Sequence, residues 1–311
     1  MHRWLNVAVP PTGDLSALHR WRTPSTNALA PTSVQLLVWN IDYASPHPYT
    51  RLLRILSYLE QIAKFRSGSP SPCCILLQEV AMHVFPSLLA HQWVRTNFLV
   101  VPSGPDRWPP GTTYGNVTLV SKAVPFLSAQ LLVFGNSTMG RSALFVDIAL
   151  RDPRSARHLT LRLANTHLES LPDLAPARYE QLSAIAHKLR EPGLYGGVVA
   201  GDMNTLRPSD EIMHTRAGLL DAYKDDPRDR ESFTWGFQPP SHYPPGRLDR
   251  IYYTPGKAVS DGYPLYVYEP EVMGINLKTE YRTWASDHRG LISRVRFSPV
   301  APREVGLCRL L

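Results

Sequence analysis

Cysteine is scarce in this chain of 311 residues, and long apolar runs are missing. The three cysteines, Cys73, Cys74 and Cys308, form neither an even disulfide framework nor the paired spacing of a zinc site. Such usage is typical of a reducing compartment, so we expect the protein in the nucleus or the cytoplasm. No run approaches the ~18 apolar residues of a membrane span, and residues 1–3 lead into no signal-peptide core. A membrane partner is therefore not expected.

Acidic residues are outnumbered by basic ones. The 33 Lys and Arg against 26 Asp and Glu give a net charge of +7 and a pI near 9.4. This balance favours polyanionic partners, because Lys and Arg attract and hold phosphates. A soluble protein that is basic for no such reason is the alternative, so charge supports a nucleic-acid partner without establishing one.

The composition suits one large α/β domain. Hydrophobic residues make up 43% of the chain, enough for the core of a domain of ~250 residues. Residues 1–33 contain scattered prolines and no sustained periodicity, which predicts an N-terminal arm that Trp4 and Trp21 could pin to the domain. We assign residues 34–298 to the domain and 299–311 to a C-terminal tail.

Periodicity predicts the elements of this domain. Apolar residues at helical spacing predict a helix over 52–63, with Arg51 and Arg54 outside the apolar series, and a second helix over 176–190. Short apolar runs predict strands at 34–38, 73–77, 98–101, 117–120, 144–150, 159–164, 197–200, 248–253 and 291–297.

Short polar clusters follow several predicted strands, and catalytic side chains commonly lie at strand ends. Glu79 comes two residues after the buried run that ends at Leu77. A carboxylate there is costly unless it meets a cation, and Mg²⁺ takes one or two such ligands together with water and substrate phosphate. An ordinary solvated glutamate is the alternative reading of Glu79 alone.

A second cluster follows the strand at 197–200. Gly201 permits a tight turn, from which Asp202 and Asn204 project. A carboxylate and an amide two residues apart can orient a water molecule and take its proton. An Asx-turn that merely closes the strand is the alternative.

Two further clusters supply histidines. Asp287 and His288 offer a carboxylate and an imidazole that could stabilise charge on a phosphoryl oxygen, and Asp249 is the candidate acidic partner of His288. His167 lies at the end of another predicted strand, with Ser170 as a possible phosphate donor. A lone histidine is more often structural, so the argument rests on the set.

The set, in its order along the chain, resembles the endonuclease/exonuclease/phosphatase superfamily from residue 34 to about residue 297. Within that superfamily it is similar to the Mg²⁺-dependent (type-2) 5′-tyrosyl-DNA phosphodiesterases. The motifs that carry this similarity are 39–42, 77–80, 137–141, 166–170, Arg178 with Gln181, 233–235, 249–251 and 286–291. The resemblance implies a four-layer α/β sandwich, in which two packed mixed β-sheets are flanked by helices.

The resemblance also implies a reaction: hydrolysis of the phosphodiester between a DNA 5′ end and a trapped topoisomerase tyrosine, which leaves a 5′-phosphate. Glu79 and Asp287 would hold Mg²⁺, with Mn²⁺ as a substitute. Asn40 would position the phosphate or the metal's waters. Asp202 would activate the attacking water with help from Asn204.

Other matching positions would contact the substrate. His288, oriented by Asp249, and His167 would donate to phosphoryl oxygens. Ser170 would hold the 5′ phosphate, and Trp235 would form an aromatic wall beside the DNA end. The expected partner is a DNA 5′ end that bears a tyrosyl or peptide adduct, bound by a monomer.

Some positions depart from the family or match it less closely. Tyr114 matches a tyrosine on a mobile loop of the family, whereas Tyr43 follows Asp42 where the family commonly has glycine. Arg207 is shifted by one position from the family's arginine. We expect Arg141, Arg207 and Arg247 to contact backbone phosphates.

Two alternatives remain open. One keeps the fold and changes the substrate, as in an endonuclease, an RNA deadenylase, or an inositol or sphingolipid phosphodiesterase. The other is an inactive scaffold that binds DNA ends. Retention of every expected metal and acid/base position argues against the scaffold.

Overall fold

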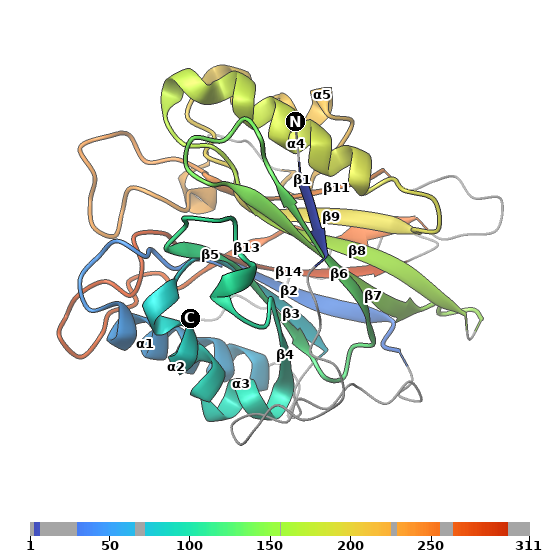
Figure 1. Cartoon of the computed structure of the whole chain (residues 1–311), viewed down its shortest axis with the longest axis horizontal. Helices are drawn as coiled ribbons and strands as arrows, with labels where there is room; N and C mark the ends of the chain where they lie inside the picture. Colours follow the sequence, from blue (N-terminus) through green and yellow to red (C-terminus); the bar gives the residue numbers. More distant parts are fainter. Residues whose placement is uncertain are drawn as a thin grey trace.

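Two seven-stranded sheets pack face to face, and helices cover both outer faces (Figure 1). The computed structural model describes the backbone of residues 3–6 and residues 30–65, 72–155, 157–224, 229–255 and 264–297, except the side chains of 64 and 65. Both sheets mix parallel and antiparallel pairs. The predicted four-layer α/β sandwich is confirmed.

The first sheet has the strand order β1-β6-β7-β8-β9-β11-β10. β8 and β9 are parallel, and the other neighbours are antiparallel. The strands are β1 (Arg3–Asn6), β6 (Phe126–Val133), β7 (Ser142–Arg151), β8 (His158–His167), β9 (Gly196–Asp202), β10 (Leu220–Asp221) and β11 (Asp249–Tyr253).

The second sheet has the order β12-β14-β2-β3-β5-β4, and β13 also pairs with β14. Its one parallel pair is β2 with β3. The strands are β2 (Ser33–Asn40), β3 (Cys73–Ala81), β4 (Phe98–Val101), β5 (Tyr114–Ser121), β12 (Leu265–Val267), β13 (Glu271–Met273) and β14 (Gly290–Phe297).

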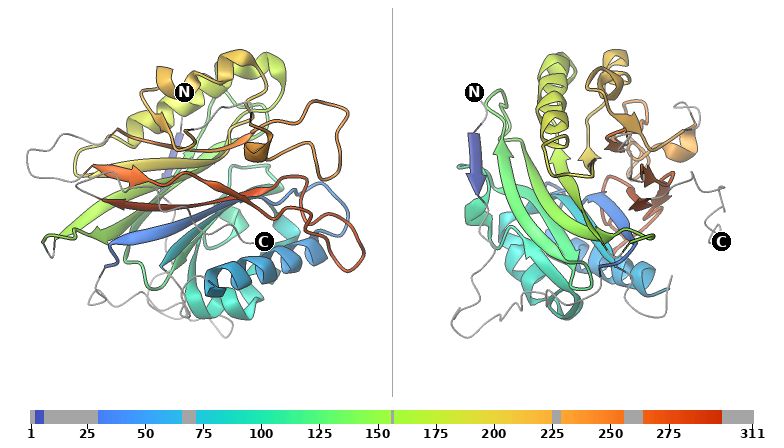
Figure 2. Two further views of the ribbon diagram at one scale, coloured as in Figure 1. Left: turned by 180° about the vertical axis from the view of Figure 1, so that it is seen from behind. Right: turned by 90° about the vertical axis from the view of Figure 1, so that its right-hand side faces the viewer.

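Helices α1 (Pro48–Phe65), α2 (Phe85–Ala90) and α3 (Gln92–Asn97) lie on the outer side of the second sheet, and α4 (Ala175–Lys188) and α5 (Met213–Arg216) lie on that of the first (Figure 2). Short 3₁₀ helices occupy Met82–Val84, Pro105–Arg107, Pro172–Leu174, Pro208–Asp210 and Arg230–Ser232. Among the described residues, no helix is long and apolar enough to cross a membrane.

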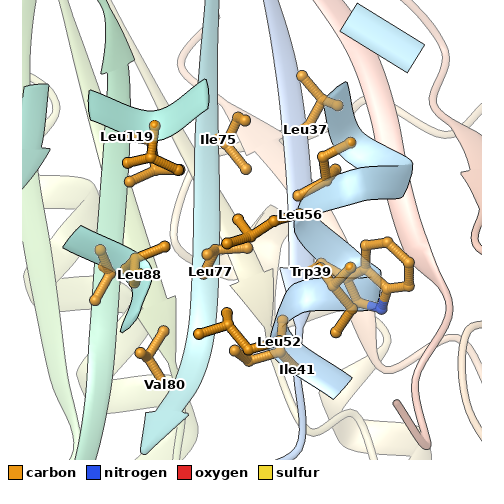
Figure 3. Close-up of a cluster of buried hydrophobic side chains, with 14 of the residues drawn as sticks. Leu37, Trp39, Ile41, Leu52, Leu56, Ile75, Leu77, Val80, Leu88 and Leu119 are labelled. Atoms are coloured by element: carbon orange, nitrogen blue, oxygen red, sulfur yellow. The ribbon is translucent and has the colours of Figure 1, made fainter. Parts of the chain in front are cut away.

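Strand β2 shows why the apolar runs of this sequence form central strands. Alternate residues point to opposite faces of a sheet. Leu36 faces the other sheet, whereas Leu37 and Trp39 face α1, where Leu52 and Leu56 cover them (Figure 3). Both faces are buried, so a continuous apolar run is required. Truncating such a leucine to alanine typically costs about 2–5 kcal/mol.

The predicted helices and strands coincide with observed elements, although residues 189–190 and 248 lie just beyond the ends of α4 and β11, whereas β1, β6, β10, β12 and β13 were not predicted. β1, within the predicted arm, pairs with β6, so Arg3–Asn6 lies on the domain as a strand. The side chains of Trp4 and Trp21, like the tail at 299–311, lie outside the described residues. Arg51 is buried, although the apolar series of its helix excluded it.

The sheet topology places the polar clusters at one end of the sandwich. The parallel pairing of β2 with β3 brings Asn40 opposite Gln78, and that of β8 with β9 brings His167 opposite Asp202. Antiparallel β11 begins with Asp249 opposite Asp202. The loops after β2, before β11 and before β14 gather at this end, coloured blue, orange and red in Figure 2.

Candidate active site

A polar bridge joins the two sheets beneath the clusters. The Gln78 amide donates to Asn165 Oδ1 over 2.7 Å. Asn165 in turn donates to the backbone oxygens of Leu77 (3.1 Å) and Val117 (3.0 Å). Because these groups are buried and paired, they fix the spacing of the strand ends. The role of Asn165 was not evident from the sequence.

A β-bulge directs Glu79 into the site. The pairing of β3 with β5 shifts register between Leu77 and Val80, so Gln78 and Glu79 oppose the single residue Asn116. Glu79 has a positive φ of 59°, a conformation that non-glycine residues adopt mainly where the surroundings enforce it. This local geometry is not visible in the sequence.

The carboxylate of Glu79 is held on both oxygens. Oε1 accepts from the Asn40 amide (3.3 Å), and Oε2 accepts from the backbone N–H of Tyr43 (3.0 Å). Burial raises the pKa of Glu79, and the charges of Asp202 and Asp287 add to this, while the Tyr43 hydrogen bond opposes it. A nearby cation would favour the ionised form.

Asp287 is a second oxygen donor beside Glu79. It is half-buried, and its Oδ2 accepts from the indole N–H of Trp235 over 3.2 Å. Burial raises its pKa, whereas the charge of His288 opposes the rise. Mg²⁺ takes oxygen ligands such as these two carboxylates, and a bound cation would stabilise the negative charges that burial disfavours. Glu79 and Asp287 therefore fit a divalent metal ion.

Three other side chains could in principle bind a metal ion. In the described part of the chain, Asp202, Asp249 and His288 offer ligand atoms that all lie within 4.8 Å of one another. However, Nδ1 of His288 is already paired with Asp249 Oδ2 at 2.7 Å, and Mg²⁺ prefers oxygen to imidazole nitrogen. These three groups fit proton transfer and charge stabilisation better than a metal cage.

Asp202 lies at the centre of the site. Its Oδ2 accepts from the Asn40 amide (3.1 Å) and lies near Nε2 of His167 (3.3 Å) and of His288 (3.7 Å). Its Oδ1 accepts from the backbone N–H of Asn204 (2.9 Å). Burial raises the pKa of Asp202, and the charge of His288 opposes that rise. A buried, oriented carboxylate of this kind suits a general base.

The turn around Asp202 requires glycine before it. Gly201 has a φ of 144°, and a Cβ there would lie 1.9 Å from the backbone oxygen of Thr166. Asn204 has a φ of 48°, and its amide donates to the backbone oxygen of Leu168 over 3.1 Å. The predicted tight turn is thus present, and its cause is the close approach of β8.

The two histidines have opposite charge preferences. Burial disfavours the imidazolium of His288, but the carboxylates of Asp249, Asp287 and Asp202 outweigh burial and raise its pKa well above the ordinary value. The predicted pairing of Asp249 with His288 is present at 2.7 Å. These carboxylates therefore favour the imidazolium form of His288, in which both ring nitrogens can donate.

His167 stays neutral, because burial and the charges of Arg141 and His288 lower its pKa. Arg141 Nη1 lies 2.8 Å from His167 Nδ1, and a guanidinium has no acceptor atom. Nδ1 must then accept, which assigns the ring proton to Nε2, beside Asp202. That N–H can donate to an oxygen placed at the centre.

Ser286 and Arg51 fix the loops around these groups, and neither role was evident from the sequence. Ser286 Oγ donates to the backbone oxygen of Asn40 (2.6 Å) and accepts from the backbone N–H of His288 (3.0 Å). Arg51 donates to the backbone oxygens of Ile41 and Ala285, each at 3.0 Å. The segments that carry Asn40 and His288 are thereby tied together.

The predicted substrate-contacting residues lie around the rim. Ser170 Oγ is 3.5 Å from Asn204 Oδ1, and Trp235 is half-buried beside the site. Arg207 is exposed and donates to Asp173 over 3.1 Å. Tyr114 accepts from Arg141 over 3.2 Å.

Two arginines predicted to contact DNA are instead buried in contacts of the fold. Arg141 joins His167 to Tyr114 inside the site. Arg247 pairs with Asp221 at 2.5 Å. Of the three predicted arginines, only Arg207 is exposed. The sequence could not separate the three, because a pattern of charged residues does not distinguish an internal ion pair from a surface cation.

Known proteins share both sequence features and the fold with this chain. The sequence model of the Endonuclease/Exonuclease/phosphatase family matches residues 37–288, whereas no curated protein sequence matches the chain. A structure of D. rerio TDP2 complexed with single strand DNA product superposes with a TM-score of 0.66 at 20% identity, covering 85% of this chain and 98% of that one.

Two other solved structures show the same fold. TDP2 from C. elegans gives a TM-score of 0.62 at 23% identity, covering 86% of this chain and 75% of that one. The human Nocturnin catalytic domain gives 0.58 at 18% identity, covering 86% and 94%. The sequence match spans most of the chain and includes Asn40, Glu79, Asp202 and His288. This chain belongs to the endonuclease/exonuclease/phosphatase family.

Proposed function

We propose that this protein is a Mg²⁺-dependent phosphodiesterase that hydrolyses the 5′-phosphotyrosyl bond between DNA and a trapped topoisomerase tyrosine. One observation carries the proposal: Asn40 joins Glu79 to Asp202 by hydrogen bonds, so a candidate metal ligand and a candidate base share one buried centre. The protonated His288 lies 3.7 Å from the same carboxylate. Hydrolysis of a phosphodiester needs these three functions in one place.

Glu79 and Asp287 would hold the metal, which when bound supplies a positive charge that neutralises the phosphate. Asp202 takes the proton of the attacking water, and its orientation is fixed by Asn204 and Asn40. No side chain at the centre is placed as an obvious covalent nucleophile among the described residues, so direct attack by water is the simplest pathway.

The histidines supply hydrogen bonds to the phosphoryl oxygens. Nδ1 of His288 donates to Asp249, and Nε2 also carries a proton in the imidazolium form, which the carboxylates of Asp249, Asp287 and Asp202 favour by raising the pKa of His288. His167 also carries a proton on Nε2, because Arg141 donates to Nδ1. Both donors point to the region of Asp202 and can stabilise the charge that grows on phosphoryl oxygen. Removal of one such donor typically slows a reaction ~10²–10³-fold.

The choice of a tyrosyl leaving group rests on the resemblance of the motifs and on leaving-group chemistry. A phenol has a pKa near ~10 and leaves more readily than an alkyl alcohol, so no dedicated acid is required. The shared fold of TDP2, including the structure with single strand DNA product, supports a DNA strand as the rest of the substrate. Location in the nucleus and/or the cytoplasm, and action as a monomer, are part of this proposal.

A substrate panel tests this function. Purified protein is offered a 5′-phosphotyrosyl oligonucleotide, its 3′-phosphotyrosyl counterpart, an abasic duplex and poly(A) RNA, each with Mg²⁺ and with EDTA. We expect Mg²⁺-dependent release of tyrosine from the 5′ adduct only. Preferential cleavage of the abasic duplex or of poly(A) would instead assign the protein to another branch of the family.

A further inference from the structure

Two tyrosines form a stack at the mouth of the site. The rings of Tyr43, in the loop after β2, and Tyr114, at the start of β5, are 3.8 Å apart between centroids and tilted by 17°. Tyr43 is 37% exposed, whereas Tyr114 is half-buried behind it. Tyr43 stands where the family resembled by the motifs commonly has glycine. This chain therefore presents an aromatic face that the family's motif does not include.

The stack is attached to the catalytic centre through both of its members. The backbone N–H of Tyr43 donates to Glu79 Oε2 over 3.0 Å. The hydroxyl of Tyr114 accepts from Arg141, and the same Arg141 nitrogen contacts His167. The backbone of Tyr43 is thus adjacent to the carboxylate proposed to bind metal, and the Tyr114 ring stacked on Tyr43 shares Arg141 with a phosphate-directed histidine.

A continuous series of hydrogen bonds gives the site a direction. Asp202 accepts from the backbone N–H of Asn204 and from the Asn40 amide. Glu79 accepts from the same Asn40 amide and from the backbone N–H of Tyr43. The base and its amide lie at one end, and Tyr43 lies at the other. In phosphoryl transfer the attacking and leaving oxygens lie roughly in line on opposite sides of phosphorus. A water activated by Asp202 would then displace a group on the side of phosphorus that faces Tyr43.

We propose that Tyr43, backed by Tyr114, is a specificity-determining residue that stacks on the aromatic ring of the leaving group. This inference rests on the proposed function, because it assumes that the bond broken is a phosphodiester attacked from the Asp202 end. The contact between Tyr43 and Tyr114 fixes the receiving ring before substrate binds, which reduces the entropy lost on binding. Trp235, which contacts Asp287, remains available for a nucleobase.

Binding to an inactive variant tests the inference without turnover. In an Asp202→Asn background with Mg²⁺, the affinity for two labelled oligonucleotides is measured by fluorescence anisotropy, one with a 5′-phosphotyrosyl and one with a 5′-phosphoseryl end. Aromatic contacts are worth enough to change affinity about 2- to 10-fold. Tyr43→Ala should weaken the tyrosyl adduct by that factor and leave the seryl adduct unchanged.

Two matched variants separate stacking from other effects. Tyr43→Phe keeps the ring and should bind both adducts as the parent does. Tyr281→Ala removes an exposed tyrosine (61%) from another loop and should change neither affinity. Both alanine and phenylalanine retain the backbone N–H that holds Glu79, so neither substitution removes that hydrogen bond.

The outcomes distinguish this inference from the proposed function. Equal losses on the two adducts would overturn it, because Tyr43 would then support the loop or contact a nucleobase. No loss on either adduct would overturn it as well. If wild-type protein releases tyrosine but Tyr43→Ala shows no selective loss, the proposed function stands and the inference fails. If wild-type protein releases nothing but the selective loss in binding is observed, Tyr43 contacts the tyrosyl ring, but the proposed function fails and with it the assignment of that ring as the leaving group.

Discussion

Replacing Arg178 with alanine probes how the fold holds the loops beside the catalytic base. This residue of α4 is entirely buried. Its Nη1 donates to the backbone oxygens of Glu169 (3.2 Å) and Leu171 (2.7 Å), and its Nη2 donates to Asp210 Oδ2 (2.8 Å). The same carboxylate oxygen accepts from two backbone amides, at 206 and 207. One guanidinium thus ties together the loop after β8 and the loop after β9.

The expected loss of stability follows from these contacts. Removing one partner of a buried ion pair costs about 3–5 kcal/mol, because the remaining charge is left buried and uncompensated. Asp210 keeps its two backbone donors, so the lower end applies, about 3 kcal/mol. Leu171 has a φ of 71° at ψ 139°, and relaxation of that strained backbone offsets part of the cost of its unpaired carbonyl.

Urea denaturation of Arg178→Ala and wild type measures this difference. Arg207→Ala is the control, because its pair with Asp173 is exposed and should change the free energy of unfolding very little. Adding Asp210→Ala to Arg178→Ala should cost much less than Asp210→Ala alone, since the two residues act together. A loss below about 1 kcal/mol for Arg178→Ala would refute the reasoning, because a buried charge cannot lose its partner so cheaply.

Four further predictions follow from the site and its surroundings. His288→Ala should lower kcat ~10²–10⁴-fold while DNA binding persists; a kcat above about a tenth of wild type would withdraw its role. Mg²⁺ at about 100 times its Kd should raise the free energy of unfolding by about 2.7 kcal/mol, and Glu79→Gln should remove most of that gain in a thermal-shift titration. Trp235→Phe should keep base stacking but weaken Mg²⁺ binding, because it loses the indole donor to the metal carboxylate, whereas Trp235→Ala should also lose about 1–3 kcal/mol of binding to single-stranded DNA. Burial raises the pKa of Glu191, but Lys188 and Arg162 outweigh burial and lower this pKa from 4.5. Its stabilising effect should be present above pH 4.5 and disappear as pH falls through the lower folded-state pKa, which unfolding curves of wild type and Glu191→Gln would measure.

The strand ends could be predicted from the sequence because two signals coincide there. Apolar runs mark central strands buried on both faces, and the polar residues directly after them lie at one edge. Asn40, Asp202 and His288 therefore meet as expected. The pairing of Asp249 with His288 was also predicted, since a catalytic imidazole needs an acidic partner on its far nitrogen.

Other features depend on contacts that the sequence does not reveal. The bulge at Glu79 arises from the register between β3 and β5. Arg178 was identified only as a position that matches the family, because its partner Asp210 lies 32 residues away and the sequence does not indicate the pair. Strand β6 was missed because Ser128 and Gln130 interrupt its apolar residues. β1 is a short edge strand, whose pairing with β6 local periodicity cannot indicate.

The central claim is that one buried centre, with Asp202 as base, hydrolyses a 5′-phosphotyrosyl bond. The most direct measurement is a single-turnover time course of tyrosine release from a 5′-phosphotyrosyl oligonucleotide with Mg²⁺, for wild type and for Asp202→Asn at equal, saturating enzyme. We expect release by wild type and a rate at least ~10²-fold slower for Asp202→Asn, with unchanged binding of the oligonucleotide. Equal rates for the two proteins, or no release by wild type, would contradict it.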